Sequence, residues 1–63
     1  MNEQMQKQLA LKARNLGQPI SFNSTNELKA LSDMVADNRM FRRDDGLYVL
    51  TPAGGLWLDG LET

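Results

Sequence analysis

The chain has 63 residues and a formal net charge of −1 at pH 7, and it contains neither cysteine nor histidine. This composition excludes disulfides, metal sites built on thiolate or imidazole ligands, and catalytic relays that depend on histidine. The length allows one small domain, and a chain of this size buries only about 60% of the surface that its unfolded form exposes.

A first helix is predicted over residues 2–16, because the apolar residues of this stretch fall on one stripe at helical spacing, namely Met5, Leu9, Ala13 and Leu16. Gly17 is suited to end it, since glycine readily adopts the left-handed conformation that follows many helices. An extended segment is expected next, with Ile20 and Phe22 pointing inward and Pro19 indicating an edge strand.

A second helix is predicted over residues 25–38. The preceding residues fit a capping box, in which the Ser24 hydroxyl and the Glu27 carboxylate satisfy free amides at the helix start. Leucine and valine positions then define the expected buried stripe, with a methionine at its edge: Leu28, Leu31 and Val35, with Met34 beside them.

A β-hairpin is predicted after this helix. Asp45-Gly46 is typical of a two-residue turn, which requires positive φ angles, and residues 40–43 and 47–51 supply the strands. A two-residue turn would pair Phe41 with Leu50, whereas a three-residue turn starting at Asp44 would shift the pairing by one residue. Both faces carry apolar residues, so the alternation leaves both registers open.

Thr51-Pro52 predicts the start of a terminal helix, with threonine as N-cap and proline at the first helical position. Gly54 and Gly55 together cost this helix about 2 kcal/mol relative to alanines. Its apolar residues must therefore dock onto the rest of the chain, and one of the glycines would let two backbones approach closely. Because a buried tryptophan contributes several kcal/mol, truncating Trp57 is expected to unfold the chain.

Together these elements predict an α+β fold, with two N-terminal helices, a short edge strand, a C-terminal hairpin and a short terminal helix. No apolar run approaches the length of about 20 residues that a membrane span requires. The first residues also lack the basic and then apolar order of a secretory signal. We therefore expect a cytoplasmic protein without membrane contact, and homodimerisation as a source of added stability.

Catalytic chemistry is not expected. Asp44 and Asp45 are neighbouring carboxylates at a solvated turn, and the hydroxyl side chains have no base to activate them. Gly54-Gly55 lacks the spacing and the lysine of a phosphate-binding loop. The sequence therefore predicts no enzyme activity, metal or cofactor.

A binding surface is the remaining candidate. Arg39, Arg42 and Arg43 are three of the seven basic residues and lie within five positions, where arginines are suited to bind phosphates. The alternative is a solvated face, with Arg43 stacked on Tyr48 or paired with Asp44.

The order of a helix, this arginine-rich segment and the hairpin resembles that of the winged-helix DNA-binding domains. In that family a recognition helix leads into a two-stranded wing, whose second strand often ends in a Tyr-x-Leu-Thr-x-x-Gly pattern. Here the pattern is formed by Tyr48, Leu50, Thr51 and Gly54. The likeness covers about residues 25–61, and the first helix and the strand at residues 20–22 match the opening elements of the family.

Two features depart from the family. Only residues 23–39 lie between the first strand and the wing, which fits one helix where a winged helix has two. The face of that helix opposite the predicted stripe also carries one net negative charge, from Asn26, Lys29, Ala30, Asp33 and Asp37. Because DNA affinity rests largely on neutralising phosphates, this face is poorly suited to a DNA groove.

Two hypotheses follow. The first is a reduced winged-helix regulator of transcription that contacts double-stranded DNA through the wing arginines with help from the second helix, using Arg39, Arg42, Arg43, Lys29 and Asn26. The second is an interaction module that binds a partner or host protein through apolar anchors, namely Leu11, Met34 and Trp57. In its small size the chain resembles regulators encoded by phages and mobile elements, some of which act on host transcription.

Overall fold

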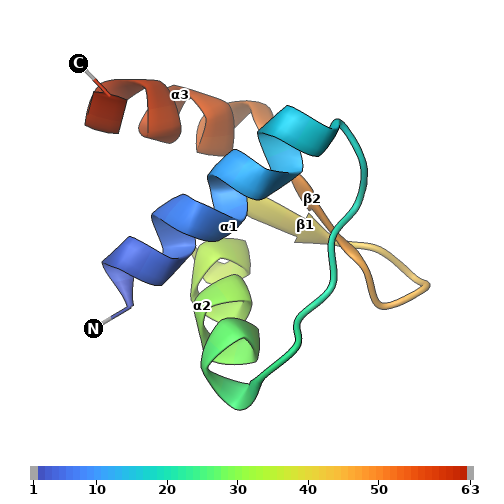
Figure 1. Cartoon of the computed structure of the whole chain (residues 1–63). Helices are drawn as coiled ribbons and strands as arrows, with labels where there is room; N and C mark the ends of the chain where they lie inside the picture. Colours follow the sequence, from blue (N-terminus) through green and yellow to red (C-terminus); the bar gives the residue numbers. More distant parts are fainter. Residues whose placement is uncertain (1, 63) are drawn as a thin grey trace.

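A computed structural model describes residues 2–62, and within this range the chain forms three helices and one two-stranded antiparallel hairpin (Figure 1). The elements are α1 (Glu3–Leu16), α2 (Thr25–Ala36), β1 (Met40–Arg42), β2 (Tyr48–Leu50) and α3 (Pro52–Glu62). The α+β fold class and the order of its elements are as predicted. The turn of the hairpin projects away from the helices.

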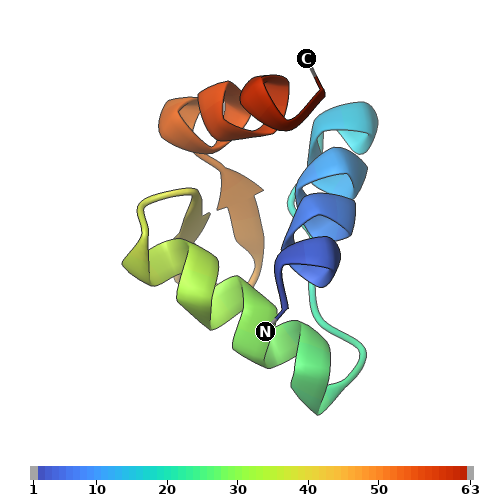
Figure 2. The same ribbon diagram turned by 90° about the vertical axis from the view of Figure 1, so that its left-hand side faces the viewer.

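Helix α1 packs against both other helices (Figure 2). It ends as predicted at Gly17, which has a φ of 62° and donates its N–H to the carbonyl oxygen of Ala13 at 3.0 Å. The predicted stripe is wrong at its last member, because Leu16 is 55% exposed. The face that the neighbouring elements cover is instead formed by Gln6, Leu9, Ala10 and Ala13.

Helix α2 begins with the predicted cap. The Ser24 hydroxyl accepts a hydrogen bond from the Glu27 amide at 3.2 Å, and the Glu27 carboxylate accepts one from the Asn23 amide at 2.6 Å. The helix ends two residues before the predicted position, because Asn38 adopts a left-handed conformation with a φ of 65°. The amide of Arg39 then turns back to the carbonyl oxygen of Met34 at 2.7 Å, as in a Schellman motif.

The buried face of α2 differs from the predicted stripe by one position. Met34 is completely buried beside Ala30 and Leu31, whereas Val35 is 36% exposed. The flexible methionine side chain fills the space between α2, α1 and the hairpin. Helical periodicity located this face only approximately, because the neighbouring elements decide which edge of the stripe is covered.

The hairpin adopts the three-residue turn, with Arg42 paired to Tyr48 and Phe41 paired to Val49. The Arg43 amide donates to the Leu47 carbonyl oxygen at 2.7 Å, which closes the turn. In this register Met40 and Tyr48 both face the core, where they are 2% and 4% exposed. The two-residue register would point one of them to solvent.

A further short pairing extends the hairpin on the other side of β2. Ile20 exchanges both main-chain hydrogen bonds with Tyr48, at 2.9 and 2.8 Å, and its side chain is buried. The segment beyond this bridge leaves the sheet, so Phe22, which was expected to point inward, is 42% exposed. The bridge matches the position of the first strand in a winged helix.

Helix α3 is capped as predicted, because the Thr51 hydroxyl accepts a hydrogen bond from the Gly54 amide at 2.9 Å. Gly54 is the glycine at which two backbones approach, since a Cβ there would overlap the carbonyl oxygen of Arg39. Gly55 has open space at the same position.

Candidate functional site

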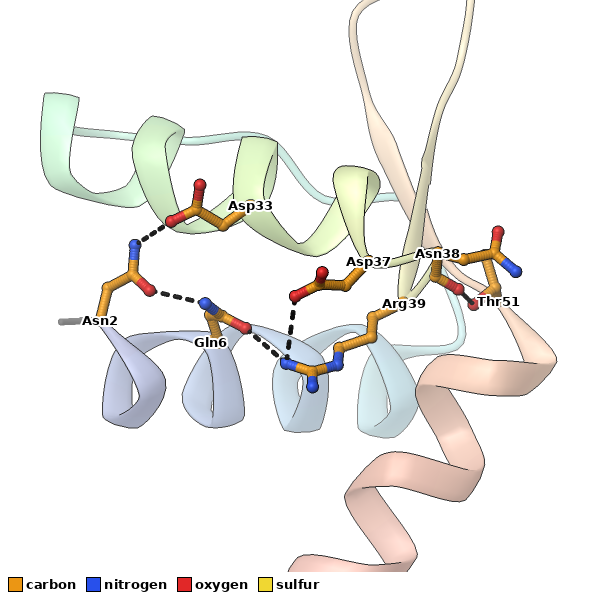
Figure 3. A network of polar contacts seen from close by, with 7 residues as sticks. All are labelled: Asn2, Gln6, Asp33, Asp37, Asn38, Arg39 and Thr51. Carbon is orange, nitrogen blue, oxygen red and sulfur yellow. Dashed lines mark hydrogen bonds and ion pairs between the residues drawn. The ribbon is translucent and has the colours of Figure 1, made fainter.

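Arg39 does not lie on the wing with the other two arginines. Its guanidinium donates to the Gln6 side-chain oxygen at 3.0 Å (Figure 3). It also lies 4.3 Å from the centre of the Trp57 ring. The Asp37 carboxylate lies 3.8 Å from the same guanidinium, and the Arg39 side chain is only 25% exposed. The left-handed turn at Asn38 directs the chain back toward α1 and α3. The phosphate-binding role predicted for Arg39 stays a prediction, and the structure shows its guanidinium in contact with α1, with α3 and with the residue that follows α2.

The contacts of Arg39 continue along α1 as a polar network. The buried Gln6 side chain donates to the Asn2 side-chain oxygen at 2.6 Å, and Asn2 donates to the Asp33 carboxylate at 2.9 Å. Both ends of the Gln6 amide therefore have partners. Sequence reasoning missed this network, because a glutamine on a predicted polar helix face gives no sign that it is buried.

Arg42 and Arg43 are the two arginines that remain on the hairpin surface. Arg43 lies 3.2 Å from the Asp45 carboxylate, and both side chains are 46% exposed. Its partner is thus the second aspartate of the turn, not Asp44 or Tyr48 as the alternative interpretation of the sequence expected. Among the described residues Arg42 has no ion pair, so it is the one uncompensated cation on the hairpin.

The outer side of the hairpin carries an exposed aromatic ring. Phe41 is 60% exposed and borders a shallow hollow of about 340 Å³, whose other lining residues are Arg43, Asp44 and Asp45. We call these four residues the outer hairpin face. Sequence reasoning did not single out Phe41, because its outward position depends on the register that the alternation left open.

The two predicted DNA-contacting residues of α2 lie apart from this face. Asn26 and Lys29 are exposed and line a different hollow of about 480 Å³, together with Asn2, which precedes α1, and three residues of α1: Gln4, Met5 and Gln8. Ala30, which was expected on the outer face of α2, is completely buried. The structure therefore does not join the α2 residues and the hairpin arginines into one basic surface.

The three predicted protein anchors are also distributed differently from expectation. Met34 is completely buried in the core, so it is not available to a partner. Trp57 is half-buried beneath Arg39, and Leu11 is half-buried on α1. Among the described residues, the most exposed large apolar side chain is Leu56 of α3, at 73%, followed by Phe41 at 60%.

No known protein family, curated protein or solved structure matches this chain. The winged-helix likeness therefore rests on the architecture, whose order of elements is compatible with that fold, although one helix stands where the family has two. Across residues 2–62, no cluster of side chains suitable for a metal ion occurs. In the same range no helix is long and apolar enough to cross a membrane.

Proposed function

We propose that this chain is a protein-interaction module that keeps a winged-helix-like architecture and binds its partner through the outer hairpin face. The role is one of binding, without catalysis. The observation that carries the proposal is the exposed Phe41 ring of β1, beside which Arg43 is already paired with Asp45. Aromatic side chains, phenylalanine included, are enriched at protein interfaces relative to the rest of the protein surface.

The charges of the hairpin support a protein partner over DNA. Between residues 42 and 45 two arginines are balanced by two aspartates, so the segment has no net charge. Arg39, the third arginine of the predicted cluster, is engaged with Gln6 and Trp57. Asp33 of α2 and Asp37, which follows the last residue of α2, are both exposed. A chain with these charges neutralises few phosphates, and phosphate neutralisation supplies most DNA affinity.

DNA binding remains the second candidate, favoured by one observation. Arg42 is exposed and uncompensated at the position where a wing contacts the DNA backbone. In this alternative Arg42 and Arg43 would bind phosphates, and the chain would act as a small regulator of transcription.

A salt titration separates the two candidates. Fluorescence anisotropy with a generic labelled DNA duplex should show no binding by the wild-type chain, even at low salt. The contrary result would be binding whose affinity falls with rising salt, with a slope that corresponds to several neutralised phosphates. That binding would be lost in the double variant Arg42→Ala, Arg43→Ala. Lys12→Ala, which removes an exposed cation from α1, is the matched control for general electrostatic attraction.

A further inference from the structure

We propose that the outer hairpin face binds an arginine side chain of its partner protein, with the guanidinium over the Phe41 ring and beside the Asp44 carboxylate. The inference rests on the proposed function and specifies the chemistry of the partner, which is a segment that presents a basic side chain.

The charge of the hollow provides the first argument. Its lining carries one positive charge, from Arg43, and two negative charges, from Asp44 and Asp45. Asp45 is already engaged, because its carboxylate accepts a hydrogen bond from the Leu47 amide at 3.0 Å and lies 3.2 Å from Arg43. Asp44 is exposed and has neither an ion pair nor a side-chain hydrogen bond among residues 2–62. Its charge is the one that the hollow leaves uncompensated.

The chain itself brings no further cation to this face. Successive side chains of a strand point to opposite faces, so Arg42 lies on the face opposite Phe41 and Arg43. It is accordingly not among the residues that line the hollow. Within residues 2–62, the cation that lies over an aromatic ring is Arg39, and its ring is that of Trp57. The Phe41 ring and the Asp44 carboxylate are therefore both accessible to a cation from outside.

The contacts of Arg39 show how this pair of groups holds a guanidinium. That side chain lies 4.3 Å from the centre of the Trp57 ring and 3.8 Å from the Asp37 carboxylate. The outer hairpin face offers the same two kinds of group on the surface. A planar guanidinium can stack on a ring while its N–H groups bond to a carboxylate, which a compact ammonium does less well. This favours arginine over lysine.

The size of the hollow suits one side chain. Its volume of about 340 Å³ is at the lower end of the range for ligand pockets, about 300–1,000 Å³, and it is shallow. An exposed ion pair and an exposed cation–aromatic contact are each weak. The arginine would therefore fix the orientation of a larger interface and add specificity for a basic partner.

An NMR titration of the amide resonances with capped pentapeptides tests the inference. The probe is Gly-Gly-Arg-Gly-Gly, and its matched peptides carry glutamine or glutamate in place of arginine. The arginine peptide should shift the resonances of residues 41–45. Phe41→Leu, which removes the ring, and Asp44→Asn, which removes the charge, should each weaken its binding by about threefold. Glu3→Gln is the matched control, because it removes an exposed carboxylate from α1 and should leave binding unchanged.

The inference is overturned if the arginine peptide leaves residues 41–45 unshifted, or if both hairpin variants, shown to be folded by circular dichroism, bind it as the wild type does. A loss of equal size in Glu3→Gln would also overturn it, because the attraction would then be general. Equal binding of the glutamine peptide at residues 41–45 would refute the arginine and leave the proposed function standing. Shifts at these residues that duplex DNA alone produces would instead refute the proposed function.

Discussion

At the scale of single residues, the position of Arg39 just after a helix end decides its role. The left-handed Asn38 turns the chain so that the Arg39 amide returns to the last turn of α2. The side chain then bonds to the buried Gln6 and covers the face of Trp57. A hydrogen bond from a charged donor is stronger than one between neutral groups, and stacking on an aromatic ring adds to it. Arg39 therefore contributes to the stability of the fold through these contacts.

This role predicts that Arg39→Ala lowers the free energy of unfolding by about 2 kcal/mol, because it leaves the buried Gln6 oxygen without its donor. Arg42→Ala is the matched control. Its side chain is exposed and has no ion pair among residues 2–62, so its effect should stay within about 0.5 kcal/mol. Urea denaturation followed by circular dichroism measures both values. Equal losses in the two variants would show that the network around Arg39 contributes nothing.

At the scale of elements, the junction between β2 and α3 holds the parts of the fold together. Thr51 caps α3 with its hydroxyl oxygen and donates the hydroxyl proton to the Asn38 carbonyl oxygen at 2.5 Å. Its amide bonds to the Arg39 carbonyl oxygen at 3.1 Å. One residue thus joins the end of α2, the start of β1 and the first turn of α3. Gly54 allows this close approach because it has no Cβ.

Gly54→Ala should destabilise the chain by about 2 kcal/mol or more, because the added methyl group overlaps a backbone atom that cannot move without displacing β1. Gly55→Ala is the adjacent control. Nothing lies near its new Cβ, so the better helix propensity of alanine should raise stability by up to about 1 kcal/mol. Thermal unfolding of both variants gives the comparison. A Gly54→Ala variant as stable as Gly55→Ala would contradict the observed contact.

Element boundaries that depend on local chemistry could be predicted from the sequence. Gly17, the capping box at Ser24 and Thr51-Pro52 each act within one helical turn, and all three are confirmed. The details that failed depend on distant parts of the chain. Whether Met34 or Val35 is buried is decided by where α1 and β1 lie, and the hairpin register is decided by which strand face meets the core.

The candidate site was harder to predict for the same reason. Three arginines within five positions of sequence suggest one surface. The left-handed Asn38, however, turns the chain so that the Arg39 side chain contacts Gln6 and Trp57. The exposure of Phe41 likewise follows from a three-residue turn that could not be distinguished from a two-residue turn. Lys29 and Asn26 were joined to this cluster by family resemblance, but they lie beside α1.

At the scale of the whole molecule, stability depends on the attachment of α3 to α1. A chain of this length has a total stability of only about 3–9 kcal/mol. Helix α3 is held by Leu58, which is completely buried, and by Trp57, which packs against the core and beneath Arg39. Loss of either side chain would therefore remove a large share of the total.

Trp57→Ala should lower the melting temperature by about 15 °C, because truncating a large aromatic side chain costs about 3 kcal/mol even when it is partly exposed. The neighbouring Leu56→Ala removes a side chain that is 73% exposed, so its melting temperature should stay close to that of the wild type. Calorimetry on dilute samples separates this effect from self-association. If Leu56→Ala were the more damaging change, α3 would have to pack through its opposite face. If neither mattered, α3 would contribute little, and the hairpin would have to be held by α1 and α2 alone.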